Sequence, residues 1–213
     1  MLPDPNAIRA ALREHSPQSL PPLPGRTNHL AAGVLVPLRW ARDDVEVILT
    51  ERALDLSNHP GEICFPGGRP EEGDEDVCAT ALREAREEIG LEHADVLGKL
   101  SSIPLYTSDH RLHPFVAQVP SDARLRIQPE EVASIVVLRV RALLDSQSMH
   151  GIPWEQEGMT HVSPIFETDT KVVFGGTAHA LWELLGVVAP LFDRTLPALI
   201  TGKYTWADVL PRR

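Results

Sequence analysis

Cysteine, long apolar runs and net positive charge are all scarce or missing in this sequence. Among its 213 residues only Cys64 and Cys78 are cysteines, which is too few for a disulfide framework and indicates a reducing compartment. No apolar run approaches the roughly 20 residues that a membrane-spanning helix needs. The N-terminal residues have neither the basic start nor the apolar centre of a signal peptide, so we expect a cytoplasmic protein.

The missing positive charge restricts the partners. Lysine and arginine number 20 against 30 aspartates and glutamates, and the formal net charge is −10, which argues against nucleic acid and against an anionic membrane. An anionic substrate would therefore need a local positive centre, either a metal ion or placed arginines. What is present is apolar material, 43% of the residues, enough for one globular domain with a sizeable core.

Apolar patterning predicts helices and strands that alternate along the chain. Helices are expected at residues 5–15, 77–89, 142–147 and 177–190. Strands are expected at residues 30–40, 45–50, 96–106, 112–119 and 134–140, followed by a late hairpin of residues 161–166 and 171–174. Elements interspersed in this way favour an α/β layered domain with a mixed sheet. We divide the chain into an N-terminal helix with a proline-rich arm, residues 1–28, and one domain, residues 29–213, that ends in a helix.

The clearest helix, residues 77–89, places carboxylates at the rim of its apolar stripe. At about 100° per residue, Glu88 falls inside the edge of the stripe centred on Ala85, and Glu84 lies just beyond it. A carboxylate at the rim of a core costs free energy unless a cation or a hydrogen-bond donor meets it. Clustered carboxylate oxygens, with Glu87 adjacent, suit a hard divalent cation such as Mg²⁺ or Mn²⁺.

A solvated surface helix is the alternative interpretation. Pairs such as Arg83 and Glu87, one turn apart, commonly decorate exposed helices without any ligand. The glycine-rich turn that precedes the helix favours the metal site, because glycine lets backbone groups approach a ligand closely. From the residues alone both interpretations stay open.

Residues 68–91 resemble the Nudix box, the signature of hydrolases that act on nucleoside diphosphates linked to another group. Gly68 and Asp74 have the spacing of its first half, and REAREEIGL, from Arg83 to Leu91, fits its second half. Two departures are visible: Asp74 stands where the family has glutamate, and eight residues instead of seven separate it from Arg83. Glu75 would restore the second gap but break the first.

Upstream, LTERALDLSNHPGEICFPGG, from Leu49 to Gly68, resembles the signature of the coenzyme A pyrophosphatase subgroup. The resemblance implies a Nudix fold, a mixed β-sheet sandwiched between α-helices, over residues 29–213. It also implies a metal-dependent enzyme that cleaves coenzyme A or acyl-CoA to 4′-phosphopantetheine and adenosine 3′,5′-bisphosphate. ADP-ribose, dinucleotides and noncanonical nucleoside triphosphates are alternative substrates, and a non-catalytic nucleotide-binding module is an alternative of another class.

The resemblance also implies roles for individual residues. Glu84 and Glu88 are expected to bind Mg²⁺ or Mn²⁺ directly, with Glu87 as a further ligand or water contact and with the carbonyl of Gly68 as an extra ligand. Arg83 is expected to orient the glutamates. The catalytic base is sought either in the box, at Glu87 or Glu88, or in a distant loop, where Glu131 is the candidate.

Three further residues are candidates for binding the substrate. Arg52 and Arg69 can contact phosphates, because a guanidinium fork matches phosphate oxygens, and a surface ion pair is the alternative for each. His59 can donate a hydrogen bond to a phosphate or a base. The expected partner is thus a small nucleotide, with neither nucleic acid nor membrane, and a homodimer is left open.

Overall fold

The computed structural model describes residues 2–156 and 158–210, so the last three residues of the predicted domain lie outside the described part. The helices are α1 (Pro5–Glu14), α2 (Val77–Ile89), α3 (Val140–Leu144), α4 (Gly175–Val188), the 3₁₀ turn η1 (Ala189–Phe192) and α5 (Trp206–Val209). The strands of the main sheet are β1 (Leu30–Trp40), β2 (Val45–Arg52), β3 (Ile63–Cys64), β4 (Gly67–Gly68), β5 (Asp95–Lys99), β6 (Ile103–Pro104), β7 (His110–Val119) and β8 (Val132–Arg139). A second sheet contains β9 (Ser148–Gln156), β10 (Met159–Glu167), β11 (Val172–Val173) and β12 (Ala198–Ile200).

The main sheet is mixed, as predicted. Its central path runs β3-β2-β1-β7-β5; β4 also pairs with β1, β6 with β7 and β8 with β2. The long neighbours β1 and β7 are parallel, whereas β1 and β2 form the antiparallel hairpin that the turn at residues 41–44 predicts. Because side chains alternate between the two faces of a strand, the nearly continuous apolar run of β1 supplies both faces of the sheet.

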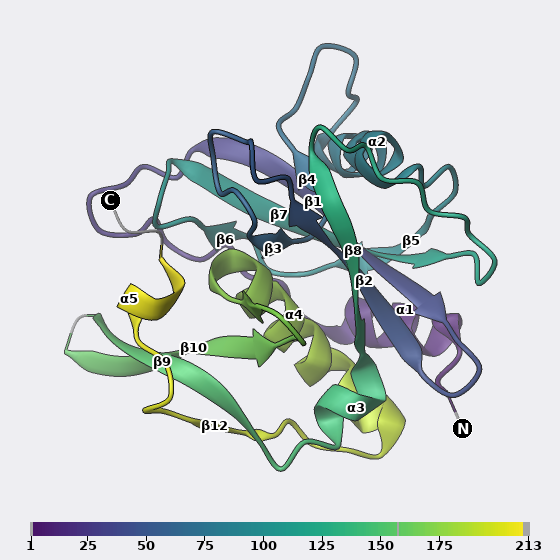
Figure 1. The fold of residues 1–213 in the computed structure, drawn as a ribbon. Helices are drawn as coiled ribbons and strands as arrows, with labels where there is room; N and C mark the ends of the chain where they lie inside the picture. The colour runs from purple at the N-terminus through teal and green to yellow at the C-terminus, as the bar shows by residue number, and fades with distance from the viewer. Residues whose placement is uncertain (1, 157, 211–213) are drawn as a thin grey trace.

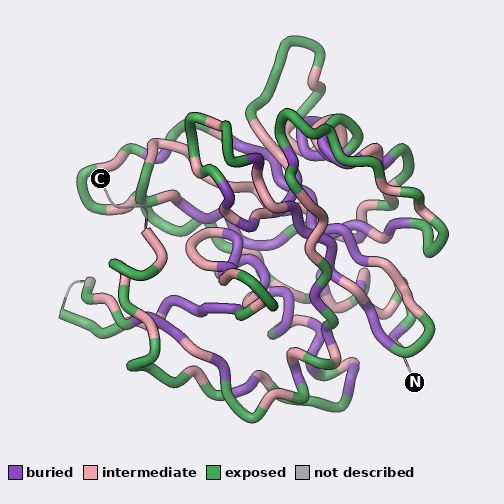
Figure 2. The backbone as a smooth tube through the Cα atoms, viewed as in Figure 1, coloured by how far each residue is buried: buried purple, intermediate pink, exposed green. Residues whose placement is uncertain are grey.

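Helices cover both faces of this sheet, which confirms the predicted sandwich (Figure 1). Leu35 of β1 and Ile48 of β2 pack on one face against Ala85 and its neighbours in α2. Val34 and Val36 belong to the core on the other face, which contains residues of α1 and α4. Buried backbone runs through both layers in Figure 2, with exposed residues concentrated in the loops.

The second sheet was not predicted as a unit. Residues 161–166 and 171–174 do form a hairpin, seen as β10 and β11, but β10 also pairs with β9 and β9 with β12. Together these strands place α4 between two sheets (Figure 1). Two boundaries were also wrong: residues 96–106 form two short strands, and the short helix is α3, two residues earlier than expected.

The N-terminal segment contacts the same core as the rest of the chain. Ile8 and Leu12 of α1 are 1% and 4% exposed and pack in the core shared with α4. His15, at the end of α1, lies 2.6 Å from Glu183 of α4. Helix α1 therefore contributes to the packing of the sheet face opposite α2.

Candidate metal centre

Local signals fix both ends of α2, the helix that carries most of the candidate residues. Asp76 accepts a hydrogen bond from the backbone N–H of Ala79 at 2.8 Å and so caps the first turn. Gly90 adopts the left-handed conformation at φ 65° and ends the helix. The predicted bounds, 77–89, are confirmed.

Glu88 is a buried carboxylate with an unsatisfied oxygen. The residue is 4% exposed, as its place at the rim of the apolar stripe predicts, and its Oε2 atom has no hydrogen-bond partner. Burial, followed by the nearby charge of Glu84, raises the pKa of Glu88 to about 8, and Arg52 opposes this shift. A buried carboxylate oxygen without a partner is costly and is stabilised by a cation.

Two further carboxylates converge on Glu88. Glu84, Glu88 and Glu131 each offer an oxygen atom, and these atoms lie within 4.8 Å of one another. Burial raises the pKa of Glu84, while the adjacent Arg83 lowers it. Three carboxylates around an unpartnered buried oxygen form the all-oxygen donor set that a hard divalent cation prefers, so the residues fit Mg²⁺ or Mn²⁺.

Backbone hydrogen bonds hold Glu131 close to α2, although Glu131 follows Glu88 by 43 positions in the sequence. The N–H of Gln128 donates to the carbonyl of Glu88 at 2.8 Å, at the end of α2. The carbonyl of Glu131 itself accepts from the N–H of Ala53 at 2.8 Å, just after β2. The loop before β8 is thereby fixed between α2 and β2, with Glu131 exposed at its end.

Arg83 organises the acidic residues around the cluster. Its guanidinium bonds Asp74 at 3.1 Å, Glu84 at 3.1 Å and Glu87 at 2.8 Å, and it also donates to the carbonyl of Arg69 at 2.9 Å. The Arg83 side chain is only 15% exposed, so it is not the solvated residue that the surface-helix interpretation describes. These ion pairs raise the pKa of Arg83, and they lower the pKa of Asp74 to about 2.

The contacts of Asp74 resolve the ambiguous spacing of the sequence motif. Asp74, not Glu75, faces Arg83, and it also accepts a hydrogen bond from the Thr80 hydroxyl at 2.9 Å. The turn before α2 therefore accommodates the additional residue without moving the acidic partner of Arg83.

Glu87 and Gly68 take different places in this arrangement. The Glu87 side chain is 52% exposed and pairs with Arg83, and its oxygens are not part of the three-carboxylate cluster. Gly68 lies directly against Glu84: a β-carbon at this position would come within 2.6 Å of the Glu84 carboxyl carbon. Only glycine leaves room there for the carboxylate.

The charge of Arg52 acts on the cluster, whereas His59 and Arg69 have other neighbours. The Arg52 charge lowers the pKa of Glu88, and its Nε donates to the carbonyl of Asn58 at 3.3 Å. His59 pairs with Glu62 at 2.9 Å, and this hydrogen bond raises the pKa of His59. Burial lowers the pKa of His110, and the charge of the exposed Arg69 lowers it further.

Residues 27–156 match the NUDIX domain family, which is more than half of the chain. The chain belongs to the Nudix family. Nudix hydrolase NudL of Photorhabdus laumondii is 33% identical over 170 residues, covering 78% of this chain and 89% of the relative. NudL of Yersinia pestis is 34% identical over 155 residues, covering 71% and 76%. A MutT/nudix family protein from Enterococcus faecalis is a structural neighbour with TM-score 0.50 at 13% identity, covering 87% and 73%, which supports the fold alone.

Nudix hydrolases generally use divalent metal ions, and the cluster of Glu84, Glu88 and Glu131 fits that property. Among the described residues, no helix is both long enough and apolar enough to cross a membrane. The Nudix fold, the mixed sheet and the acidic helix predicted from the sequence are thus present in one chain.

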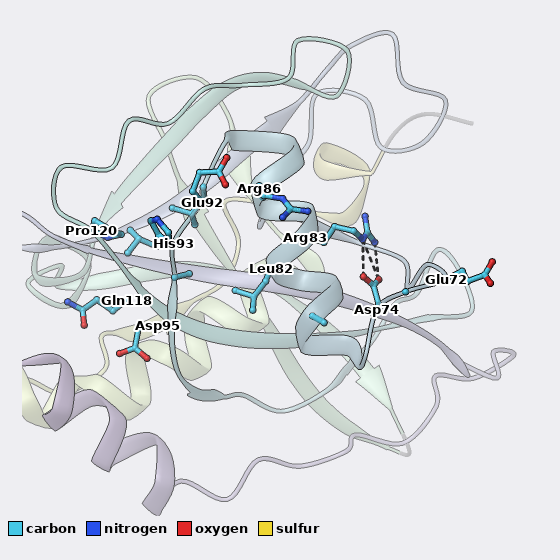
Figure 3. A pocket seen from close by; sticks show the side chains of 15 residues that line it. Glu72, Asp74, Leu82, Arg83, Arg86, Glu92, His93, Asp95, Gln118 and Pro120 are labelled. Carbon is cyan, nitrogen blue, oxygen red and sulfur yellow. Dashed lines mark hydrogen bonds and ion pairs between the residues drawn. The ribbon is translucent and has the colours of Figure 1, made fainter.

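A groove of about 950 Å³ lies along the flank of α2 that carries Leu82, Arg83 and Arg86 (Figure 3). At about 100° per residue, Glu84 and Glu88 fall on the other flank of the helix. Leu82 and Arg86 of α2 form one side, and His93 and Gln118 lie across from them. Its charged lining residues have both signs, and the three-carboxylate cluster is not among them. Arg83 is the link between the two flanks, since it lines the groove with Asp74 and also bonds Glu84.

The structure adds residues that the Nudix resemblance does not identify. Lys171, in the turn between β10 and β11, contacts Glu51 at the end of β2 and the carbonyl of Gly61. The two side chains are 120 positions apart: Glu51 lies within the motif at residues 49–68, whereas Lys171 belongs to no motif that the sequence displays. Only the tertiary structure brings them together.

Proposed function

We propose that this Nudix protein hydrolyses the pyrophosphate bond of coenzyme A or acyl-CoA and releases 4′-phosphopantetheine and adenosine 3′,5′-bisphosphate. The observation that supports the proposal is the contact between the motif at residues 49–68 and the carboxylate cluster. Gly68 abuts Glu84, and the charge of Arg52 acts on Glu88. The stretch that resembles the coenzyme A subgroup therefore forms one wall of the candidate metal centre.

In this proposal Glu84 and Glu88 would hold Mg²⁺ or Mn²⁺, with the carbonyl of Gly68 and the exposed Glu87 as further contacts. A bound divalent ion would neutralise charge on the pyrophosphate and lower the pKa of a bound water. Arg83 orients Glu84 through the ion pair at 3.1 Å. The chain would thus supply position and electrostatics.

Glu131 is the proposed general base, because it is the exposed member of the cluster. Water attacks one phosphorus, the bond between that phosphorus and the bridging oxygen breaks, and the proton of the water passes to Glu131. Arg52, His59 and Arg69 are proposed to contact the phosphates of the substrate. The proposal includes a reducing, cytoplasmic setting, which the free thiols of Cys64 and Cys78 support.

The test incubates the purified protein with coenzyme A and with Mg²⁺ or Mn²⁺ at a free concentration well above the dissociation constant of a weak site. Chromatography detects adenosine 3′,5′-bisphosphate. Glu88→Gln keeps the size of the side chain and removes its charge, so we expect turnover to fall by about 100-fold or more while the fold persists. Glu92→Gln, at an exposed glutamate just beyond the helix, is the matched control and should leave turnover unchanged.

Two results would change the assignment. Hydrolysis of ADP-ribose, a dinucleotide or a noncanonical nucleoside triphosphate, with coenzyme A untouched, would replace the substrate and retain the chemistry. Nucleotide binding without turnover of any of these compounds would point to a non-catalytic module.

A further inference from the structure

The last residues of β2 form a junction with the C-terminal half of the chain. The Glu51 carboxylate accepts from Lys171 Nζ at 2.6 Å and from the Ser134 hydroxyl at 2.9 Å. Lys171 and Ser134 both lower the pKa of Glu51, mainly through these hydrogen bonds. The Glu51 and Lys171 side chains are 21% and 35% exposed, so this ion pair is partly shielded from water.

Lys171 makes a second contact, to the loop at residues 53–62. Its Nζ donates to the carbonyl of Gly61 at 2.7 Å. Gly61 has φ 69°, and a β-carbon there would lie 2.7 Å from the same Nζ atom. The turn that presents Lys171 is itself fixed, because Thr168 and Lys171 exchange three hydrogen bonds through their backbone groups and the Thr168 hydroxyl.

The loop, in turn, holds Arg52. The Gly61 N–H donates to the carbonyl of Arg52 at 3.1 Å, and the Arg52 N–H donates to the carbonyl of Glu62 at 3.0 Å. The Arg52 side chain donates to the carbonyl of Asn58 in the same loop. Lys171 therefore bonds Gly61, and Gly61 bonds the backbone of Arg52. The charge of the Arg52 guanidinium in turn acts on Glu88.

We propose that Lys171 is a positioning residue: it anchors the 53–62 loop and thereby holds Arg52, and the His59 of that loop, in place for phosphate recognition. The role in recognition rests on the function proposed above, whereas the anchoring does not. Lys171 lies beyond residues 27–156, so the C-terminal hairpin, outside the matched NUDIX domain, would contribute to the substrate site.

The anchoring is tested by amide hydrogen exchange on the metal-free protein. In Lys171→Met we expect exchange of the amides within residues 53–62 to rise about tenfold or more, because the loop loses its charge-assisted hydrogen bond to Gly61. Lys171→Arg keeps the charge and the donors and should restore most of the protection. Lys203→Met removes a lysine from a different ion pair, with Glu167, and should leave the loop unchanged.

The recognition is tested by steady-state kinetics with coenzyme A. We expect Lys171→Met to raise KM about tenfold with a smaller effect on kcat, because Glu84 and Glu88 are carried by α2, outside the loop. Lys171→Arg should return KM toward the wild-type value. Gly61→Ala, which disturbs the same contact while Lys171 remains, should raise both KM and loop exchange, and it provides a second variant should Lys171→Met fold poorly.

Unchanged exchange of the loop in a folded Lys171→Met would overturn the proposal, whatever Gly61→Ala shows, because alanine at φ 69° strains the loop by itself. Faster amide exchange of the loop with an unchanged KM would overturn the proposal as well, since substrate recognition would then not depend on Lys171. If the wild-type protein leaves coenzyme A intact, the proposed function fails, and the exchange experiment still decides whether Lys171 anchors the loop.

Discussion

At the scale of single residues, the site depends on a close approach between backbone and carboxylate. Gly68 in β4 leaves the space that the Glu84 carboxylate occupies. We expect Gly68→Ala to displace that carboxylate and to weaken Mn²⁺ binding by about tenfold or more, while the fold persists, because the Gly68 φ is compatible with alanine. Titration calorimetry with Mn²⁺ measures the change.

Gly186→Ala is the matched control for this substitution. Gly186 lies in α4, and a β-carbon there would meet only Leu196, at an ordinary 3.4 Å. We expect the Mn²⁺ affinity of Gly186→Ala to equal that of the wild type. Its stability should be unchanged or slightly higher, because alanine has a higher helix propensity than glycine. Equal Mn²⁺ affinity in Gly68→Ala and in the wild type would contradict the role of Glu84 as a ligand.

Residue-level features were predictable from the sequence where the cause is local. The helical wheel predicted the burial of Glu88, since the period of 3.6 residues fixes which side chains meet the core. It did not predict that Arg83 is nearly buried, because its partners Asp74 and Glu84 converge only after the preceding turn folds. The contacts of Lys171 depend entirely on long-range packing.

At the scale of elements, one side chain fastens the proline-rich arm to the sheet. Asn28 is 2% exposed; its amide donates to the carbonyls of Leu105, Ser108 and His110 at 3.0–3.1 Å and accepts from the N–H of Leu23 at 2.9 Å. We expect Asn28→Ala to lower the free energy of unfolding by about 2–4 kcal/mol, because three partly buried carbonyls lose their donor. Thermal unfolding should show a fall of about 5–15 °C.

Two variants separate the causes of that loss. Asn28 has φ 44°, so Asn28→Gly relieves any strain of the left-handed backbone but still removes the hydrogen bonds. It should therefore remain clearly less stable than the wild type. Asn6→Ala, at an exposed asparagine in the first turn of α1, should change the unfolding temperature little. An Asn28→Gly variant as stable as the wild type would show that Asn28 contributes to stability through its backbone conformation and not through the hydrogen bonds of its amide.

The helices and strands differ in how well they can be predicted from their sequences. Helix α2 was predicted to the residue because Asp76 and Gly90 cap it locally and its apolar stripe is regular. Strand β9 was missed because Gly151 and Pro153 interrupt its pattern, and it is stabilised by pairing with β10 along most of its length. β12 has three residues and exists only through its parallel pairing with β9.

At the scale of the whole molecule, α4 joins the two sheets and carries a partly buried histidine. His179 lies 3.0 Å from the hydroxyl of Ser163 in β10, and Ser163 is 1% exposed. Burial lowers the pKa of His179 below its usual value. The folded protein therefore favours the neutral imidazole, whereas the unfolded chain takes up a proton at about pH 6.5.

The direction of the resulting pH effect follows from proton uptake. Above about pH 6.5 the imidazole is neutral in both states, and its contribution to stability is fully present. As the pH falls below that value the unfolded chain binds the additional proton, so stability is lost by up to about 1.4 kcal/mol per pH unit until the folded pKa is reached. His110 and His113, whose pKa values burial also lowers, act in the same direction, and His59 acts in the opposite one.

Only a difference between variants isolates the contribution of His179. We expect His179→Gln, which can still hydrogen-bond Ser163, to lose less stability than the wild type between pH 7.5 and pH 5, as measured by denaturant unfolding with a chelator present. His93→Gln, at an exposed histidine, should follow the wild-type profile. If His179→Gln kept the full pH dependence, the contact between α4 and β10 would not be the pH-sensitive link between the two sheets, and His110 and His113 on the other sheet would have to carry the loss.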